Sequence, residues 1–263
     1  MYRGFDLKIP NDLNSSKSLE IGKEILELTN EIVKKSLNNY LLDNGSLDGT
    51  KIIKNWFPEF ESHIFLSHSH KDREKAMTIA GMLAKEFGIL TFIDSTVWGY
   101  SNELLKKIDD EYCLHTNREN YDYEKRNYST AHVHLMLSTA LNKMIDNSEC
   151  LFFLNSPNSI TTSTEINQKT NSPWIFSEIA TSKIIRKQTP ERLKKKTKMF
   201  SSSDVIAMKE STKLNIEYEL ELSHLTTLDT SDILNWKNTP ANSPEEALDN
   251  LYKQHNINTK FLL

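Results

Sequence analysis

Short apolar runs alternate with amphipathic stretches through the middle of the chain. Three such runs are typical of strands buried on both faces of a sheet, at residues 63–67, 89–93 and 150–154. Between them, apolar residues recur at helical spacing over residues 76–87, where Gly88 supplies a C-terminal stop, and over residues 133–144. Strands that alternate with helices predict an α/β fold, with a mostly parallel sheet covered on both faces.

The two ends of the chain have patterns of their own. Apolar residues at helical spacing within residues 16–42 predict an amphipathic helix, which packs on the main domain or on another copy of it. The sequence DNGSLDGT at residues 43–50 indicates a turn or linker, and SPEE at residues 243–246 indicates a capping box that begins a last helix. We therefore predict three parts: an N-terminal helical extension and linker (1–61), an α/β domain (62–223) and a C-terminal extension with a short helix (224–263).

Two further elements are predicted near the end of the α/β domain. Ser172 and Pro173 favour the start of a helix, in the N-cap and N1 positions. Strict alternation of apolar and polar residues over 214–222 predicts a strand with one wet face, at or near a sheet edge. Ligands of such sheets bind beyond the carboxyl ends of the strands. The first candidates for chemistry are therefore the residues that follow the three apolar strands, after Ser67, Asp94 and Leu154.

Composition narrows the class of protein. The 263 residues, of which 38% are hydrophobic and 26% charged, allow one large domain or one ordinary domain with terminal additions. No apolar run of about 18 residues occurs and the N-terminus lacks a signal-like apolar region, so we expect a cytoplasmic protein with no membrane span. The two cysteines, Cys113 and Cys150, form no CxxC pair, so we expect neither a zinc site nor a disulfide. A net charge of −4 argues against broad nucleic-acid binding.

Three motifs resemble those of TIR domains and occur in the order found in that family. The sequence HIFLSHSHKD at residues 63–72 resembles the opening strand and loop. The sequence FIDSTVWGY at residues 92–100 resembles the second strand and the mobile BB loop that follows it. The sequence SPWIFSE at residues 172–178 resembles the segment that carries the catalytic glutamate of NAD-cleaving TIR proteins, with Trp174 four residues before Glu178.

The resemblance covers residues 62–223 and implies a flavodoxin-like three-layer TIR fold. Within the family, the chain most resembles bacterial TIR proteins of anti-phage defence, including the Thoeris type, which make nucleotide signals. Two segments depart from the family pattern. Residues 110–129 form a polar insertion that a minimal TIR domain lacks, and residues 186–213 are longer than the usual link to the last strand.

The chemistry of NAD cleavage explains the residue types that the resemblance selects. Breaking the bond between nicotinamide and ribose creates positive charge on the ribose, while nicotinamide leaves as a neutral molecule and needs no general acid. The main requirement is one carboxylate beside the ribose, a role implied for a partly exposed Glu178. The indole of Trp174 can stack on the cationic nicotinamide ring. The alternatives are that Glu178 is an ordinary helix carboxylate and that Trp174 is only a core residue.

Further substrate-binding residues are expected on the two loops. One group follows the first strand and is placed to meet phosphate or adenine: His68, Ser69 and His70. The other group closes the opposite side as a mobile loop: Asp94, Ser95, Trp98 and Tyr100. Histidines at a strand end also often cap backbone groups, so both roles stay open for the first group. His132 and His134 are two residues apart on a helix, on different sides, and cannot act as paired metal ligands.

The resemblance implies an enzyme, a TIR-type NAD glycohydrolase or an ADP-ribosyl cyclase, that takes NAD as substrate and needs no cofactor. Its product would be a signal in bacterial antiviral defence, read by a downstream effector protein, and self-association through TIR contacts is expected. ADP-ribose is transferred to water, to itself as a cyclic product, or to another acceptor. Two alternatives remain: a non-enzymatic TIR adaptor, which needs neither Glu178 nor Trp174, and a nucleoside deoxyribosyltransferase, which also places a glutamate near ribose.

Overall fold

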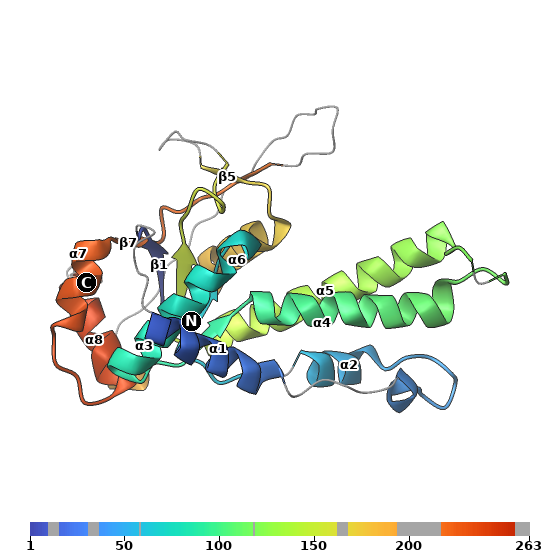
Figure 1. Ribbon diagram of the computed structural model, residues 1–263, viewed down its shortest axis with the longest axis horizontal. Helices are drawn as coiled ribbons and strands as arrows, with labels where there is room; N and C mark the ends of the chain where they lie inside the picture. Colours follow the sequence, from blue (N-terminus) through green and yellow to red (C-terminus); the bar gives the residue numbers. More distant parts are fainter. Residues whose placement is uncertain are drawn as a thin grey trace.

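A five-stranded parallel sheet lies at the centre of the molecule (Figure 1). The computed structural model describes residues 1–9, 16–30, 37–57, 59–117, 119–161, 168–193 and 217–255. The strands of the sheet are β1 (Arg3–Leu7), β2 (Ile64–Ser67), β3 (Thr91–Ile93), β4 (Cys150–Leu154) and β7 (Thr226–Leu228). Their order is β3-β2-β4-β1-β7, and every neighbouring pair is parallel. The three apolar runs are thus strands β2, β3 and β4, and the predicted α/β class is confirmed.

Two strands of this sheet come from segments predicted to be helical additions. β1 lies within residues 1–61 and β7 within residues 224–263, so both ends of the chain complete the sheet. A flavodoxin-like sheet has the strand order 2-1-3-4-5, so the fourth strand in sequence lies beside the third. In this chain the third of the apolar strands is β4. Here β1, the first strand, takes that place beside β4. The short RGFDL run carries Gly4 and Asp6, which mask the apolar pattern of a buried strand.

Helices cover both faces of the sheet, which gives three layers (Figure 1). One face packs on α1 (Ser16–Asn30), α3 (Arg73–Phe87), α7 (Thr230–Lys237) and α8 (Pro244–Gln254). The other face packs on α2 (Gly49–Trp56), α4 (Ser95–Ile108), α5 (Tyr123–Asn147) and α6 (Pro173–Ile184). Alternation along β2 sends Ile64 and Leu66 to the first face and Phe65 to the second.

Several predicted helix ends are confirmed by their caps. Gly88 ends α3 in the left-handed conformation, at φ 67°. The hydroxyl of Ser172 accepts a hydrogen bond from the Ile175 amide at the start of α6. Ser243 caps α8 in the same way, but Glu246 reaches the Asn242 amide rather than the Ser243 amide of a true capping box.

The predicted N-terminal helix is shorter than residues 16–42. α1 ends at Asn30, the next described element is a 3₁₀ turn, η1 (Leu37–Tyr40), and Asp48 then caps α2. α1 lies directly on α3, and Gly22 and Gly81 face each other's helix with no room for a Cβ atom at either position. The helix therefore packs on its own domain, which decides between the two alternatives left open by the sequence.

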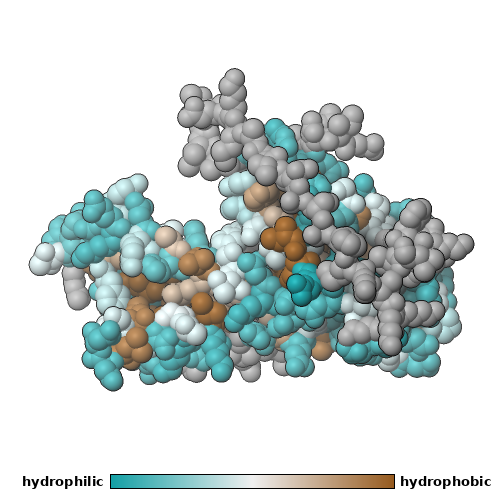
Figure 2. Space-filling view, turned by 180° about the vertical axis from the view of Figure 1, so that it is seen from behind, coloured by the Kyte–Doolittle hydropathy of each residue, from teal (hydrophilic) through white to brown (hydrophobic). Residues whose placement is uncertain are grey.

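The segment predicted to be a mobile BB loop is instead helical. Residues 95–100 form the first turns of α4, which continues through the π-helical turn η3 (Asp109–Cys113). α4, η3 and α5 form a long hairpin that projects from the sheet and contains the polar insertion at 110–129 (Figure 1). Figure 2 shows hydrophilic residues along the rim of this projecting part and hydrophobic ones in its middle. The buried carboxylate of Asp109 fixes the hairpin, because it accepts hydrogen bonds from Arg126 and Ser129.

The prediction of an edge strand over residues 214–222 is wrong for the main sheet. β6 (Tyr218–Glu219) pairs antiparallel with β5 (Lys169–Thr170) in a separate two-stranded sheet, and residues 214–216 lie outside the described residues. Within the long 186–213 segment, the described part ends with the 3₁₀ turn η4 (Glu191–Leu193). In the described parts of the chain, no helix is long and apolar enough to cross a bilayer.

Candidate active site

Glu178 lies at the carboxyl edge of the sheet, where the strand order reverses between β2 and β4. Ser67 is the last residue of β2, and alternation turns it to the same face as Phe65, toward α6. The Ser67 hydroxyl donates a hydrogen bond of 2.6 Å to Oε2 of Glu178. The glutamate is only 1% exposed, so the expectation of a partly exposed carboxylate was wrong. This reversal point is the usual ligand-binding position of an open parallel sheet.

A second buried carboxylate lies against Glu178. Asp94 follows β3 and begins α4, yet its side chain does not cap that helix. Instead its Oδ1 lies 2.6 Å from Nδ1 of His68, the residue that follows β2, and both side chains are fully buried. Three chain segments therefore bring Ser67, Glu178, Asp94 and His68 into one polar cluster inside the molecule.

Burial and the neighbouring charges set the protonation of this cluster. Burial, followed by the adjacent Asp94 charge, raises the pKa of Glu178 well above its usual value, although the Ser67 hydrogen bond acts in the opposite direction. For His68, burial lowers the pKa, but the Asp94 carboxylate, together with the Leu66 carbonyl and the Asp72 charge, raises it by more, so the pKa of His68 is raised. This arrangement favours a protonated Glu178, because two adjacent carboxylates do not both ionise readily.

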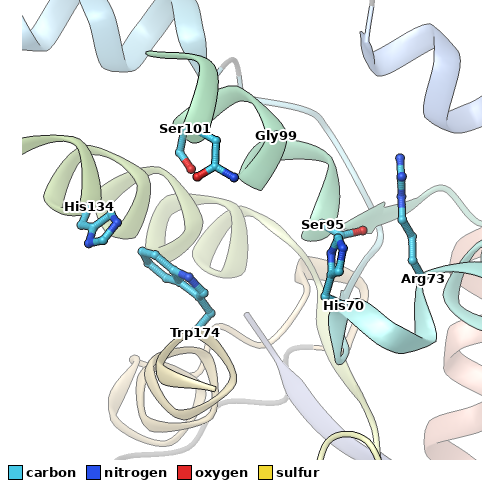
Figure 3. Close-up of a pocket in the computed structure, with 8 residues that line it drawn as sticks. His70, Arg73, Ser95, Gly99, Ser101, His134 and Trp174 are labelled. Atoms are coloured by element: carbon cyan, nitrogen blue, oxygen red, sulfur yellow. The ribbon is translucent and has the colours of Figure 1, made fainter. Parts of the chain in front are cut away.

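A pocket of about 400 Å³ adjoins the cluster (Figure 3). Residues of η2 (His70–Asp72), α3, α4, α5 and α6 line it, namely His70, Arg73, Ser95, Gly99, Ser101, Asn102, His134 and Trp174. The pocket is within the usual size range of small-ligand sites, about 300–1,000 Å³. Glu178 is not a lining residue. The pocket and Glu178 are connected by neighbours: Trp174 lies one helical turn before it, and Ser95 follows Asp94.

The structure brings most of the predicted site residues together. Trp174, His70 and Ser95 line the pocket, while Glu178 and Asp94 lie in the polar cluster beside it. The prediction that His68 meets phosphate or adenine is wrong for this structure, since its side chain points inward to Asp94.

Ser69 and Tyr100 are not among the pocket-lining residues that the structure describes. The carbonyl of Ser69 accepts the Asp72 amide at the start of η2, and Ser69 does not line the pocket. Tyr100 is half-buried and packs against the core on the α2–α6 face. The backbone of Trp98 belongs to α4, but its side chain lies outside what the structure describes.

Sequence reasoning missed several residues of the site. Ser67 was identified only as the end of a strand, although strand alternation could have assigned it to the face that α6 covers. His134 was considered only as a metal ligand, and its ring packs edge-on against Trp174 at 5.6 Å between centroids. His132 lies on a different side of α5, as the helical spacing predicted, and its ring contacts Tyr128. No sequence signal identified Arg73.

Comparison with protein-family models, curated proteins and solved structures found no match for this chain.

Proposed function

We propose that this protein cleaves the bond between nicotinamide and ribose in NAD, with Glu178 as the carboxylate that acts on the ribose. The observation that carries the proposal is the buried Glu178, oriented by Ser67 at the reversal point of a parallel sheet. The adjoining pocket supports it, because Trp174 offers an aromatic surface one helical turn from Glu178. An ordinary surface carboxylate on a helix would have neither the burial nor the fixed orientation.

In the proposed reaction, the C1′–N1 bond breaks and its electron pair stays on nitrogen. Nicotinamide leaves uncharged, and the ribose gains the positive charge that ionised Glu178 stabilises. A nucleophile, water or another acceptor, then forms the new bond at C1′ and releases a proton to the carboxylate pair of Glu178 and Asp94. Trp174 favours the cationic nicotinamide of NAD over the neutral product, because a π face attracts a cation.

Access to Glu178 sets a condition on this reaction. The side chain is 1% exposed, and the first turn of α4, beginning at Ser95, lies next to it. The ribose reaches Glu178 only when this turn moves away from α6. The proposed enzyme therefore has a closed form, in which Glu178 is sealed, and an open form that binds NAD productively.

The experiment that tests the proposal is incubation of the pure protein with NAD, with and without extract of phage-infected cells, followed by mass spectrometry of the products. We expect nicotinamide and an ADP-ribose derivative from the wild type and neither from Glu178→Gln. The matched control is Glu124→Gln, an exposed glutamate at the start of α5, which should react as the wild type does. Glu178→Gln with more than about a tenth of wild-type turnover, or about 1.4 kcal/mol of barrier, would show that another group is responsible.

Two other outcomes would assign the protein to a different class. Cleavage of deoxynucleosides with NAD left intact would indicate a deoxyribosyltransferase. No cleavage of either substrate, with or without the extract, would favour the adaptor that acts by homotypic contacts. If NAD is cleaved, the identity of the product, linear or cyclic ADP-ribose or a conjugate, also gives the class of signal that a downstream effector in antiviral defence would bind.

A further inference from the structure

The pocket beside Glu178 has two chemically different ends. Trp174 and His134 form an aromatic end, while His70, Arg73 and Ser95 lie together at the other end (Figure 3). None of the residues described as lining the pocket is acidic. Among these described residues, the ionisable side chains are those of arginine and histidine, which attract an anion.

Ser95 supplies an unused hydroxyl at this second end. Its side chain is only 7% exposed, and its Oγ has no hydrogen-bond partner among the described residues. Figure 3 shows this oxygen on the side of the pocket where Arg73 lies. A buried hydroxyl without a protein partner is unfavourable, so the Ser95 hydroxyl is available for a hydrogen bond to a ligand in the pocket.

The start of α4 adds a favourable field at the same place. Ser95 is the first residue of this 14-residue helix, whose amino end carries partial positive charge. The side chain of Asp94 does not cap the helix, because it faces His68. The first amides of α4 are therefore not satisfied by the usual N-cap side chain, and such a helix end favours an anion.

Arg73 completes this end of the pocket. Its side chain is exposed and makes no hydrogen bond or ion pair with any residue that the structure describes. The adjacent carboxylate, Asp72, does not neutralise it by direct contact, because both oxygens of Asp72 accept hydrogen bonds from Ser156 and Asn158. The guanidinium is consequently available to a ligand, and its planar fork matches the oxygens of a phosphate.

We propose that the end of the pocket formed by Arg73, Ser95 and the start of α4 binds a phosphate group of the ligand. The pocket then selects a nucleotide over the corresponding nucleoside: a planar ring contacts Trp174 and the phosphates contact Arg73. The inference of a phosphate site stands on this geometry, and its assignment to the NAD diphosphate rests on the proposed function.

Calorimetric titration tests the phosphate site without any need for turnover. The probes are ADP-ribose, inorganic pyrophosphate and adenosine, and the proteins are the wild type, Arg73→Met, Ser95→Ala and Lys71→Met. Lys71 is an exposed cation two residues away that does not line the pocket, so its variant loses the same charge elsewhere. Arg73 is exposed, and equal melting temperatures will show that its variant is folded.

We expect ADP-ribose to bind the wild type more tightly than adenosine does, and pyrophosphate to compete with it. Arg73→Met should weaken the binding of ADP-ribose at least about tenfold, and Ser95→Ala should weaken it by roughly threefold to tenfold. Both variants should bind adenosine as tightly as the wild type does. Lys71→Met should change ADP-ribose binding by less than about threefold.

Three results would overturn the inference: no binding of ADP-ribose or pyrophosphate, equal losses for ADP-ribose and adenosine in Arg73→Met, or equal losses in Arg73→Met and Lys71→Met. Each is distinguishable from failure of the proposed function, which is measured by NAD cleavage. If the protein binds ADP-ribose through Arg73 but leaves NAD intact, the phosphate site is supported and the catalytic proposal is contradicted. Conversely, if the wild type and Arg73→Met both cleave NAD and nicotinamide riboside equally well, the catalytic proposal is supported and the phosphate site is contradicted.

Discussion

Gly81→Ala should destabilise the protein, because the two helices α1 and α3 touch backbone to backbone at this position. A Cβ atom at residue 81 would lie 1.8 Å from the carbonyl oxygen of Ser18 and 2.7 Å from the amide nitrogen of Gly22. The first distance is about 1.5 Å shorter than a normal carbon–oxygen contact of about 3.3 Å. Both neighbours are backbone atoms, so no side-chain rotation relieves the clash and the whole of α1 must move.

The expected loss follows from two opposing effects. Overpacking of a closely packed interior costs about 1–3 kcal/mol, and a rigid backbone clash belongs at the upper end of that range. Alanine is about 1 kcal/mol better than glycine inside a helix, which offsets part of this cost. We therefore expect Gly81→Ala to lower the free energy of unfolding by about 2 kcal/mol, a large share of the about 5–15 kcal/mol of a typical domain.

Urea unfolding followed by circular dichroism measures this change, and Gly99→Ala is the matched control. Gly99 also lies inside a helix, α4, but a Cβ atom there would meet no heavy atom within 4 Å. The control should consequently gain about 0.5–1 kcal/mol from helix propensity alone. If Gly81→Ala were as stable as Gly99→Ala, α1 would not cross α3 at this glycine, and the helix would be free to pack on another molecule.

Three further predictions concern the site. Because burial and Asp94 raise the pKa of Glu178, its contribution to stability is complete below the unfolded-state pKa of about 4.3 and is lost as the pH rises toward the folded-state pKa. The stability of Glu178→Gln relative to the wild type should therefore increase by up to about 1.4 kcal/mol per pH unit above about pH 4.3. If the urea midpoints of the two proteins change with pH in the same way from pH 4 to 8, the buried, protonated state of Glu178 is contradicted. Trp174→Ala should reduce NAD cleavage more than Trp174→Phe, whereas equal losses with a lower melting temperature would mean that the indole is only packing. Specific activity should rise with protein concentration or with an activating partner, because the closed form seals Glu178; a flat dilution series over a range where light scattering shows only monomer would remove this dependence on assembly.

The sequence predicted the middle of the sheet better than its edges. The runs at β2, β3 and β4 are apolar without interruption, since helices cover both of their faces, and this pattern identifies them directly. β1 escaped detection because Gly4 and Asp6 interrupt it. Gly4 leaves room for the side chain of Leu225, whose Cδ2 would lie 2.3 Å from a Cβ atom there, and Asp6 is held by Asn155. Both residues contact partners more than 140 positions away in the sequence, and no local pattern contains that information.

The site was predictable by position but not by orientation. The N-cap of Ser172 and Pro173 fixes where α6 begins, so the location of Glu178 in the second turn follows from local sequence. The inward turn of His68 depends on Asp94, which arrives from β3 only after the chain has folded. The helical start at Ser95 differs from the mobile loop that the resemblance implies. Several residues of this segment have weak helix propensity, so the local sequence does not predict a helix, and α4 is stabilised by packing on α5 and α2.

In the proposed reaction, the paired carboxylates connect the charge of the substrate to the protonation of Glu178. With Glu178 and Asp94 adjacent and buried, one carboxyl group keeps its proton while the site is empty. A cationic nicotinamide ring held near Trp174 offsets the repulsion between the two carboxylates, so it favours the ionised Glu178 that the reaction requires. The neutral nicotinamide that leaves gives no such compensation, and Glu178 takes up a proton again as the product departs. The same desolvation that disfavours the charge of Glu178 when no ligand is bound strengthens its attraction for the positive ribose in the proposed transition state, where that charge is needed.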